Sequence, residues 1–380
     1  MNRQSISLIF LFFIEKNQDK RDLDKTFPQN VVTLHGIKIN VFMVKKKSYV
    51  ICAAIALLLL GICGFIYLMP VSTLTETVAV NIDNDDTADS VWVKIDSAAH
   101  PRQLVGLKSI ATLAGYTKQV HTGHYEITKG INSLFLIRKL KNGRQDPLLL
   151  TIPEVRTKEQ LAEKLGNRLM MSADSLLYYL NDSATCAQYQ TDTANIIGLF
   201  IPNSYEVYWN ITPKQLISRM EREWNVFWDD KRMQKANKIG LTPPEVITLA
   251  SIVDEETANN AEKPTIAGMY LNRLNSGMPL QADPTIKFAL RRFELRRIYH
   301  EMLKIPSKYN TYINQGLPPG PIRIPSVKGI ESVLNAQKHD YMYMCAKEDF
   351  SGFHNFAKTF AEHIDNAKRY SMALNQRGVQ

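Results

Sequence analysis

The stretch "LTPPEVITLASIVDEETA", residues 241–258, ends an apolar run with three consecutive carboxylates. Thr242 can cap a helix, a proline suits the first turn, and Glu245 stands three residues after the cap, as a capping box requires. Spacing successive residues about 100° apart gathers the apolar side chains on one arc and puts Thr248 and Ser251 opposite. The pattern therefore predicts an amphipathic helix that ends in the acidic triplet.

The three carboxylates point in different directions around this helix. Asp254 lies at the edge of the apolar arc, and Glu255 lies on the polar face, where we expect it to be solvated. Glu256 continues the apolar stripe and must be partly desolvated, which raises the pKa of a carboxyl as a general acid near neutral pH requires. Glu256 is therefore the candidate catalytic acid. A buried Glu256 paired with an arginine such as Arg273 is an equally weighted structural alternative.

A second segment, residues 48–69, contains no charged residue and has the length of one bilayer-spanning helix. Three lysines, Lys45 to Lys47, stand directly before it, which by the positive-inside rule places the amino terminus in the cytoplasm. We predict a cytoplasmic segment over residues 1–47 and an uncleaved transmembrane anchor over residues 48–69. The protein is then expected to be a single-pass membrane protein whose chain after Pro70 lies outside the cytoplasm, in the periplasm or at the cell exterior.

The amino-terminal segment also carries much of the positive charge. Of the net charge of +9 of the 380-residue chain, residues before Ser48 hold nine Lys or Arg against four Asp or Glu. The basic balance therefore gives no argument for nucleic acid as a partner. A second start-like sequence, "MVKKKSYV", begins at Met43, so we expect Met43 to be the native start.

The chain beyond the anchor reads as a linker followed by two mixed regions. Residues 70–90 are expected to form the linker, residues 91–190 a small α+β module and residues 191–375 an α+β catalytic domain. In the module, the pattern predicts strands at "VWVKI" (91–95), "GHYEI" (123–127) and "LLLTI" (148–152), and helices at 102–114, 133–142 after Asn132, and 158–165 after Thr157. In the catalytic domain it predicts a further amphipathic helix over residues 213–228.

Several motifs together resemble one family. The stretches "FIPNSYEV", "ASIVDEET", "IAGMYLNRL", "GMPLQADPTI", "YNTY", "GLPPGPI" and "FHNFAKTFAEH" occur in the order found in the endolytic murein transglycosylases, the MltG or YceG-like family. The stretch "TGHYEITKGINSLFLIRKLKNG" resembles the LysM-like subdomain of that family. The resemblance implies a membrane-anchored lytic enzyme that cuts peptidoglycan glycan strands, with cell-wall synthases as partners.

The resemblance also nominates site residues. The family's catalytic acid corresponds to Glu256, in agreement with the helical projection. The expected substrate-binding residues are Gln281, Asp283, Thr285, Tyr309, Asn310, Thr311, Tyr312 and His354, with the tyrosines offering flat faces for sugar rings. The sequence departs from the family pattern at Phe288, at Phe353 and in "RIPSVKG".

The expected reaction follows from the number of acids. Asp254 and Glu255 project about 200° and about 100° away from Glu256, and Asp283 stands before a proline that suggests a structural turn. A single acid suffices if the C6 hydroxyl of N-acetylmuramic acid attacks its own anomeric carbon. We therefore predict 1,6-anhydroMurNAc ends and neither cofactor nor metal. The resemblance implies that the bond cut is the MurNAc-GlcNAc β-1,4 bond within nascent strands and that the enzyme is a terminator of glycan elongation.

Two rival interpretations remain. A metal-dependent hydrolase would use His354, Glu362 and His363, but the nine-residue spacing of the histidines matches no compact zinc signature. The second rival is a non-catalytic, membrane-anchored peptidoglycan-binding protein.

Overall fold

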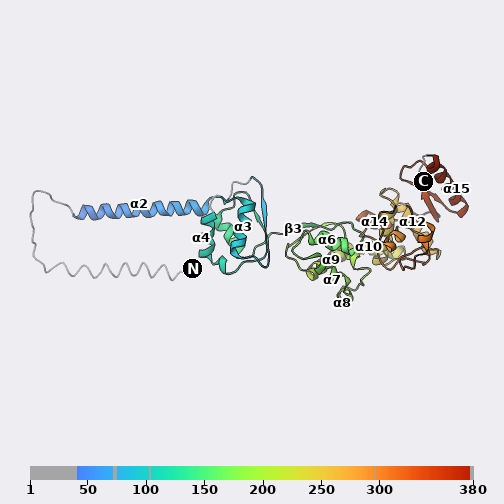
Figure 1. The fold of residues 1–380 in the computed structure, drawn as a ribbon, viewed down its shortest axis with the longest axis horizontal. Coiled ribbons are helices and arrows are strands. Elements are labelled where there is room, and N and C mark those ends of the chain that lie inside the picture. The colour runs from blue at the N-terminus through green and yellow to red at the C-terminus, as the bar shows by residue number, and fades with distance from the viewer. Residues whose placement is uncertain (1–40, 72–74, 102–103, 296, 377–380) are drawn as a thin grey trace, which may run out of the picture. The chain divides into compact units, whose positions relative to one another are not determined.

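The structure, a computed structural model, describes residues 41–71, 75–101, 104–295 and 297–376. The chain divides into two compact units, residues up to Phe65 and residues from Ile66 onward, and each is considered by itself. The first described element is the helix α2 (Val41–Leu68), drawn in blue in Figure 1. None of the helices within the described ranges combines the length and the apolar character of a membrane crossing. The predicted span over residues 48–69 is therefore helical but not confirmed as a span, and residues 1–40 of the predicted cytoplasmic segment lie outside the described residues.

The first core of the second unit forms around a two-stranded sheet. Strand β1 (Val78–Ile82) pairs antiparallel with β2 (Gly123–Ile127), so that Val78 lies opposite Ile127. Helices α3 (Ala88–Ala99), α4 (Leu104–Ala114) and α5 (Ser133–Lys141) and the short 3-10 helix η1 (Tyr116–Lys118) pack with this sheet. The predictions of a helix ending before Gly115, a strand at "GHYEI" and a helix capped by Asn132 are confirmed.

Two predictions in this region are wrong. The stretch "VWVKI" belongs to helix α3, not to a strand, because the side chain of Thr87 accepts a hydrogen bond from Ser90 N and starts a helix there. The burial follows the helical period: Val91, Trp92 and Ile95 are buried, whereas Val93 is 70% exposed. Residues 78–82, within the expected linker over residues 70–90, form β1, and residues 88–90 of that linker begin α3.

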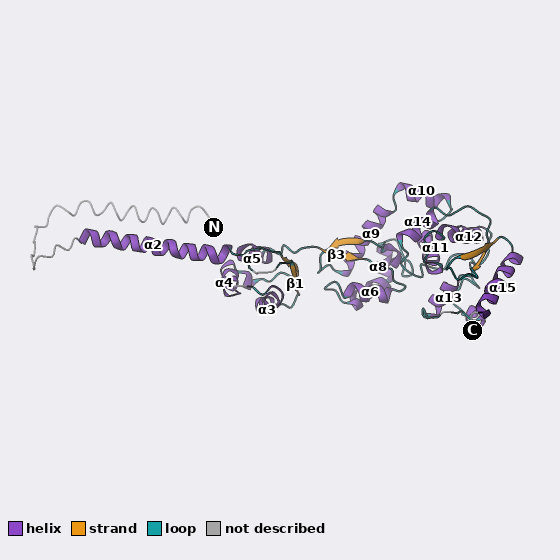
Figure 2. Ribbon diagram, turned by 90° about the horizontal axis from the view of Figure 1, so that it is seen from above, coloured by secondary structure: helices purple, strands orange, loops and turns teal. Residues whose placement is uncertain are grey.

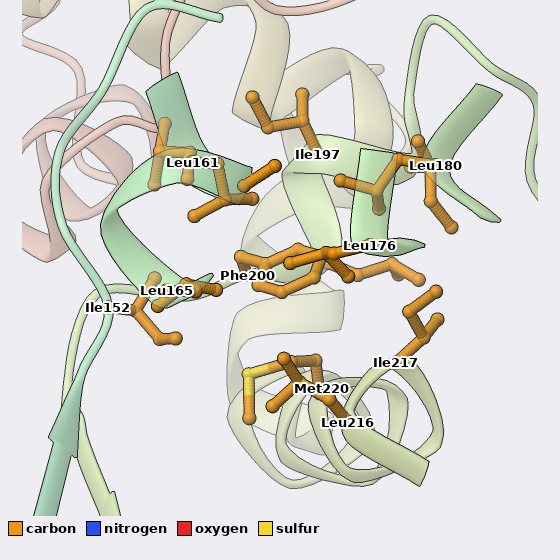
Figure 3. Packing of buried hydrophobic residues seen from close by; sticks show 14 of the residues in the cluster. Ile152, Leu161, Leu165, Leu176, Leu180, Ile197, Phe200, Leu216, Ile217 and Met220 are labelled. Carbon is orange, nitrogen blue, oxygen red and sulfur yellow. The ribbon is translucent and has the colours of Figure 1, made fainter. Parts of the chain in front are cut away.

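A second core contains residues from Leu150 to Met220. Strand β3 (Leu148–Thr151) pairs antiparallel with β4 (Ser204–Val207), and the surrounding elements are α6 (Lys158–Gly166), α7 (Ala173–Asn181), α8 (Ser183–Gln188), η2 (Ile196–Leu199) and α9 (Pro213–Phe227). Figure 3 shows Phe200 among side chains of this cluster, with Leu165 and Leu176 beside it. The cluster includes residues on both sides of position 190, where the sequence analysis placed a domain boundary.

The third core holds the acidic triplet. Its elements are α10 (Asp230–Lys238), α11 (Pro243–Glu256), α12 (Lys263–Asn275), α13 (Asp283–Leu290), η3 (His300–Lys304), α14 (Val327–Leu334), β5 (Tyr343–Ala346), β6 (His354–Ala357) and α15 (Phe360–Gln376). Helix α11 packs against α12, α13 and α14 (Figure 2). Strands β5 and β6 pair antiparallel, and α15 packs on both of them. The predicted α+β class is confirmed by this mixture of helices and two-stranded sheets.

Helix α11 has the predicted ends but not the predicted surface. Thr242 N donates to Glu245 Oε2 at 2.8 Å, as expected for the capping box. All residues from 246 to 253 are buried, including the polar Thr248 and Ser251. Ser251 Oγ donates to Thr248 O at 2.7 Å and accepts a bond from Ile322 N at 3.0 Å, at the end of the proline-rich loop. The expected solvated face is therefore covered by protein.

Candidate active site

A cavity of about 440 Å³ opens beside the carboxyl end of α11. Its walls come from α11, α12, the segment before α13, the strands β5 and β6, and α15. The lining residues are Glu256, Met269, Tyr270, Arg273, Leu280, Gln281, Asp283, Tyr312, Tyr343, Met344, Cys345, Ala346, His354, Phe360 and His363. The cavity thus brings one carboxyl of the acidic triplet together with residues from the following hundred positions.

Glu256 is the last residue of α11 and lies in this cavity. Burial raises the pKa of Glu256 to about 7, and the negative charge of Asp283 acts in the same direction. Tyr270 OH donates to Glu256 Oε1 at 2.6 Å, and this hydrogen bond works against that rise, as do the neighbouring His354 and Lys287. The predicted desolvation of Glu256 is confirmed. A carboxyl that is about half protonated near neutral pH can both donate a proton and take one back.

Arg273 does not neutralise Glu256. Its guanidinium donates to three backbone carbonyls, of Met342 at 2.6 Å, Leu280 at 2.8 Å and Pro279 at 3.1 Å. It also reaches Gln281 Oε1 at 3.2 Å. Over the described ranges no ion pair joins it to Glu256, so the structural alternative of a Glu256–Arg273 pair is wrong. Arg273 instead fixes the backbone that forms the cavity wall.

Glu255 is not the solvated carboxylate that the helical projection predicts. Its side chain is only 12% exposed and accepts from Arg156 Nε and Nη2 at 2.9 and 3.0 Å. Arg323 Nη1 donates to Glu255 Oε1 at 3.1 Å. Both arginines come from segments far from α11 in the sequence, which is why a projection of the helix alone could not place them.

Asp254 is held by a buried ion pair. Lys263 Nζ lies 2.7 Å from Asp254 Oδ1, and the two side chains are 7% and 3% exposed. Ser326 N donates to Asp254 Oδ2 at 2.6 Å, and a Cβ added to Gly329 would lie 2.4 Å from Asp254 Oδ1. Asp254 therefore ties α11 to α12 and α14. With Glu255 also committed to ion pairs, only Glu256 of the triplet lines the cavity.

Four of the predicted substrate-binding residues share the cavity with Glu256, namely Gln281, Asp283, Tyr312 and His354. Tyr312 OH donates to Asp283 Oδ1 at 2.6 Å, and burial together with Asp283 raises the pKa of Tyr312 well above its ordinary value. Asp283 is the first residue of α13, with its proline in the first helical turn, so the expected structural turn is a helix start.

His354 is oriented by a buried carboxylate. Both its backbone N and its Nδ1 lie within hydrogen-bond distance of Glu262, at 2.7 and 2.9 Å. Because a carboxylate only accepts, Nδ1 carries the proton in this contact. The rival metal site is not assembled: Glu362 accepts from Lys358 N at 2.9 Å at the start of α15, and it does not line the cavity. In the part of the chain that the structure describes, no three metal-ligating side chains come together.

The other four predicted substrate-binding residues do not line this cavity, and their role in substrate binding stays a prediction. Thr285, Asn310 and Thr311 are fully buried. Thr285 Oγ1 and Thr311 Oγ1 lie 2.9 Å apart, and Asn310 Nδ2 donates to two backbone carbonyls of the preceding loop. Tyr309 packs its ring on Phe288 at 4.8 Å. These contacts hold the loop that carries Tyr312.

Sequence reasoning missed Tyr270, Tyr343, Phe360 and the role of Glu262. Tyr270 lies fourteen residues after Glu256, in the motif "IAGMYLNRL", and shares a face of α12 with Arg273. That helical spacing is a signal that could have been used. Tyr343 and Phe360 reach the cavity only because β5 and β6 pair. This pairing could not be predicted from the sequence, because both strands are short and irregular.

A cavity with one desolvated carboxyl in an α+β fold has the arrangement of an acid–base catalyst. The chain matches the model of the YceG-like family over residues 80–369 and therefore belongs to this family. It is 29% identical over 272 residues to the endolytic murein transglycosylase of Bacillus subtilis (strain 168), covering 67% of this chain and 74% of that relative. It is 28% identical over 342 residues to the endolytic murein transglycosylase of Streptococcus pneumoniae (strain ATCC BAA-255 / R6), covering 79% of this chain but only 61% of that longer relative.

A solved structure supports the fold. The 2.6 Å crystal structure of a yceG-like protein from Listeria monocytogenes aligns with a TM-score of 0.52 at 24% identity. The alignment covers 77% of this chain and 99% of that one. At this identity the likeness concerns the fold, and the function is argued from the site.

Proposed function

We propose that this protein is an endolytic murein transglycosylase with Glu256 as its catalytic acid. The observation that carries the proposal is the Glu256 carboxyl, with a pKa of about 7, in a cavity of about 440 Å³. The family membership and the names of both curated relatives point to the same reaction. The substrate would be the β-1,4 bond between N-acetylmuramic acid and N-acetylglucosamine.

The reaction needs one proton carrier. Protonated Glu256 donates its proton to the glycosidic oxygen while the bond from that oxygen to the anomeric carbon breaks. The C6 hydroxyl of the same muramic acid then attacks the anomeric carbon, and its proton goes to the Glu256 carboxylate. The product is a 1,6-anhydro ring, no water is consumed, and Glu256 returns to its starting state. Tyr270, by holding Oε1, fixes which carboxyl oxygen faces the bond.

Hydrolysis is the second candidate, because Asp283 is the other carboxylate that lines the cavity among the described residues. Hydrolytic glycosidases use two carboxyl groups, separated by about 5–9.5 Å, with the second acting as nucleophile or activating water. We favour the one-acid reaction because Asp283 Oδ1 already accepts from Tyr312 OH at 2.6 Å.

The catalytic assignment is tested by Glu256→Gln, which is nearly isosteric and cannot donate a proton. We expect release of soluble fragments from purified sacculi to fall by about 10²–10⁴-fold, the usual contribution of a general acid. Glu163→Gln, at an exposed position of α6, is the matched control and should retain full activity. Binding of sacculi without turnover by the unaltered protein would favour the non-catalytic wall-binding alternative.

We further propose that α2 anchors the protein in the inner membrane, with the catalytic cavity in the periplasm and the LysM-like region, residues 91–190, contacting glycan. The anchor rests on the uncharged residues 48–69 and the three lysines before them. In this position the enzyme would limit strand length beside the cell-wall synthases. Protease added outside spheroplasts should remove the chain after residue 70. Protection of that chain would place it in the cytoplasm.

A further inference from the structure

A second cavity, of about 670 Å³, lies in the first core region, far along the sequence from Glu256. Its lining combines the loop before α5, the outer face of that helix and the segment after it, and it consists of Thr128, Lys129, Gly130, Ile131, Asn132, Phe135, Arg138, Lys139, Arg144, Gln145 and Asp146. Four of these side chains are cationic and one is anionic. The proposed glycan cleavage uses none of them.

Most of the positive charge of this cavity is uncompensated. Asp146 forms an ion pair with Lys139 at 2.5 Å and accepts from Glu126 N at 2.7 Å. Lys129, Arg138 and Arg144 are exposed and have no ion pair within the described ranges. The cavity therefore presents three free cations around a polar floor, which favours an anion with several oxygen atoms.

Apolar side chains stand beside these cations. Phe135, in the first turn of α5, is 63% exposed, and the neighbouring Leu134 is 53% exposed. Exposed aromatic and aliphatic groups next to Lys and Arg are typical of surfaces that lie in the interface of a bilayer, with the apolar groups inserted and the cations on phosphates.

The chain places this cavity next to the end of the proposed anchor. Val71 N donates to Ile131 O at 2.7 Å, and Pro70 forms a bridge with Asn132. The uncharged run ends at Met69, so the bonded residues follow it by one or two positions, or within about 7 Å of extended chain. That distance is comparable to the thickness of the headgroup layer, roughly 5–7 Å on each side of the hydrocarbon core.

We propose that this basic cavity binds the phosphates of anionic lipid headgroups on the outer surface of the membrane that holds α2. The inference rests on the proposed anchor. Phe135 and Leu134 enter the interface, while Lys129, Arg138 and Arg144 contact headgroup phosphates. The contact would hold the first core region against the bilayer.

Hydrogen exchange of the full chain in nanodiscs tests this inference. In discs containing phosphatidylglycerol, we expect amides of residues 128–139 to exchange roughly tenfold more slowly than in discs of phosphatidylcholine alone. The triple variant Lys129→Gln, Arg138→Gln and Arg144→Gln should lose this difference. The matched triple variant Lys108→Gln, Lys118→Gln and Lys164→Gln, at exposed lysines elsewhere, should keep it. Unchanged exchange of the buried amides of α3, in the same core as α5, shows that this core is folded in each variant.

The remaining outcomes distinguish lipid phosphates from other anions. They also distinguish a failure of this inference from a failure of the proposed anchor. Slowing by inorganic phosphate in neutral discs, or by sacculi but not by anionic lipid, would overturn the lipid assignment. Equal exchange in both kinds of disc, with the chain inserted, would overturn this inference alone. A chain that does not float with the discs would contradict the anchor and with it this placement, while the activity of Glu256 on sacculi would be unaffected.

Discussion

At the scale of single residues, the protonation of Glu256 links folding to the proposed catalysis. Folding raises the pKa of this carboxyl from 4.5 to about 7, mainly through burial. Between these values the folded chain binds more protons than the unfolded chain, so this contribution to stability is fully present below about pH 4.5 and is lost as the pH rises towards 7. Ionisation of this carboxyl therefore destabilises the folded chain. Such strongly shifted pKa values are typical of active sites.

Glu256→Gln should remove this pH dependence. The amide does not titrate, so its contribution to stability does not change with pH. We therefore expect the difference in free energy of unfolding, variant minus unaltered chain, to be up to about 3 kcal/mol larger at about pH 8 than at about pH 4. Urea unfolding at both pH values measures the change. A stability difference that does not vary with pH would show that Glu256 has an ordinary pKa in the folded chain.

Tyr270→Phe should move the pH dependence of activity. The general acid must be protonated, so kcat/KM should fall as the pH rises above about 7. The hydrogen bond from Tyr270 lowers the pKa of Glu256, and its loss should shift this alkaline limb to higher pH and reduce the maximal rate. Tyr299→Phe, at a position 56% exposed, should leave the limb in place. A limb that stays unchanged in Tyr270→Phe would contradict the assigned role of the hydrogen bond.

At the scale of elements, α11 is a buried helix whose acidic end is fixed on two sides. Asp254 pairs with Lys263, and Glu255 pairs with Arg156 and Arg323. These pairs hold the last turn of the helix and thereby the direction of Glu256. The polar residues on this helix are structural supports, although they read in the sequence as a solvated face.

Lys263→Met tests the support from α12. Removing one partner of a buried pair leaves the other charge uncompensated, so we expect a loss of about 3–5 kcal/mol in free energy of unfolding. Lys231→Met, at an exposed position of α10, should change stability by less than about 0.5 kcal/mol. Denaturant unfolding of both variants at neutral pH makes the comparison. Equal stabilities would mean that the Asp254–Lys263 pair does not hold the helix.

The sequence was informative where local rules decide the structure. The capping box at Thr242, the cap at Asn132 and the stop at Gly115 predicted their helices correctly, and the apolar stripe predicted the desolvation of Glu256. It failed where distant segments decide. The arginines that cover Glu255 come from outside α11, so the expectation of a solvated Glu255 is wrong. Burial of Thr285, Asn310 and Thr311 depends in the same way on tertiary packing.

At the scale of the whole molecule, the described residues form three hydrophobic cores, and the helix that ends in the acidic triplet packs in the last of them, beside the candidate cavity. The α+β class could be predicted from the alternation of short strands and helices. The boundary near residue 190 could not, because the residues on both sides of it belong to one core. The two proposals together assign a catalytic carboxyl to the carboxy-terminal core and membrane-facing contacts to the amino-terminal core.

The central claim is that Glu256 acts alone, with the substrate supplying the nucleophile. Its most direct test is digestion of purified sacculi by the full chain in water labelled with oxygen-18, followed by mass analysis of the muramic acid ends. The one-acid reaction predicts 1,6-anhydromuramic ends without the label, on fragments released from within strands. Reducing muramic acid ends that carry the label would contradict it and would identify a hydrolase, with Asp283 as the second carboxylate.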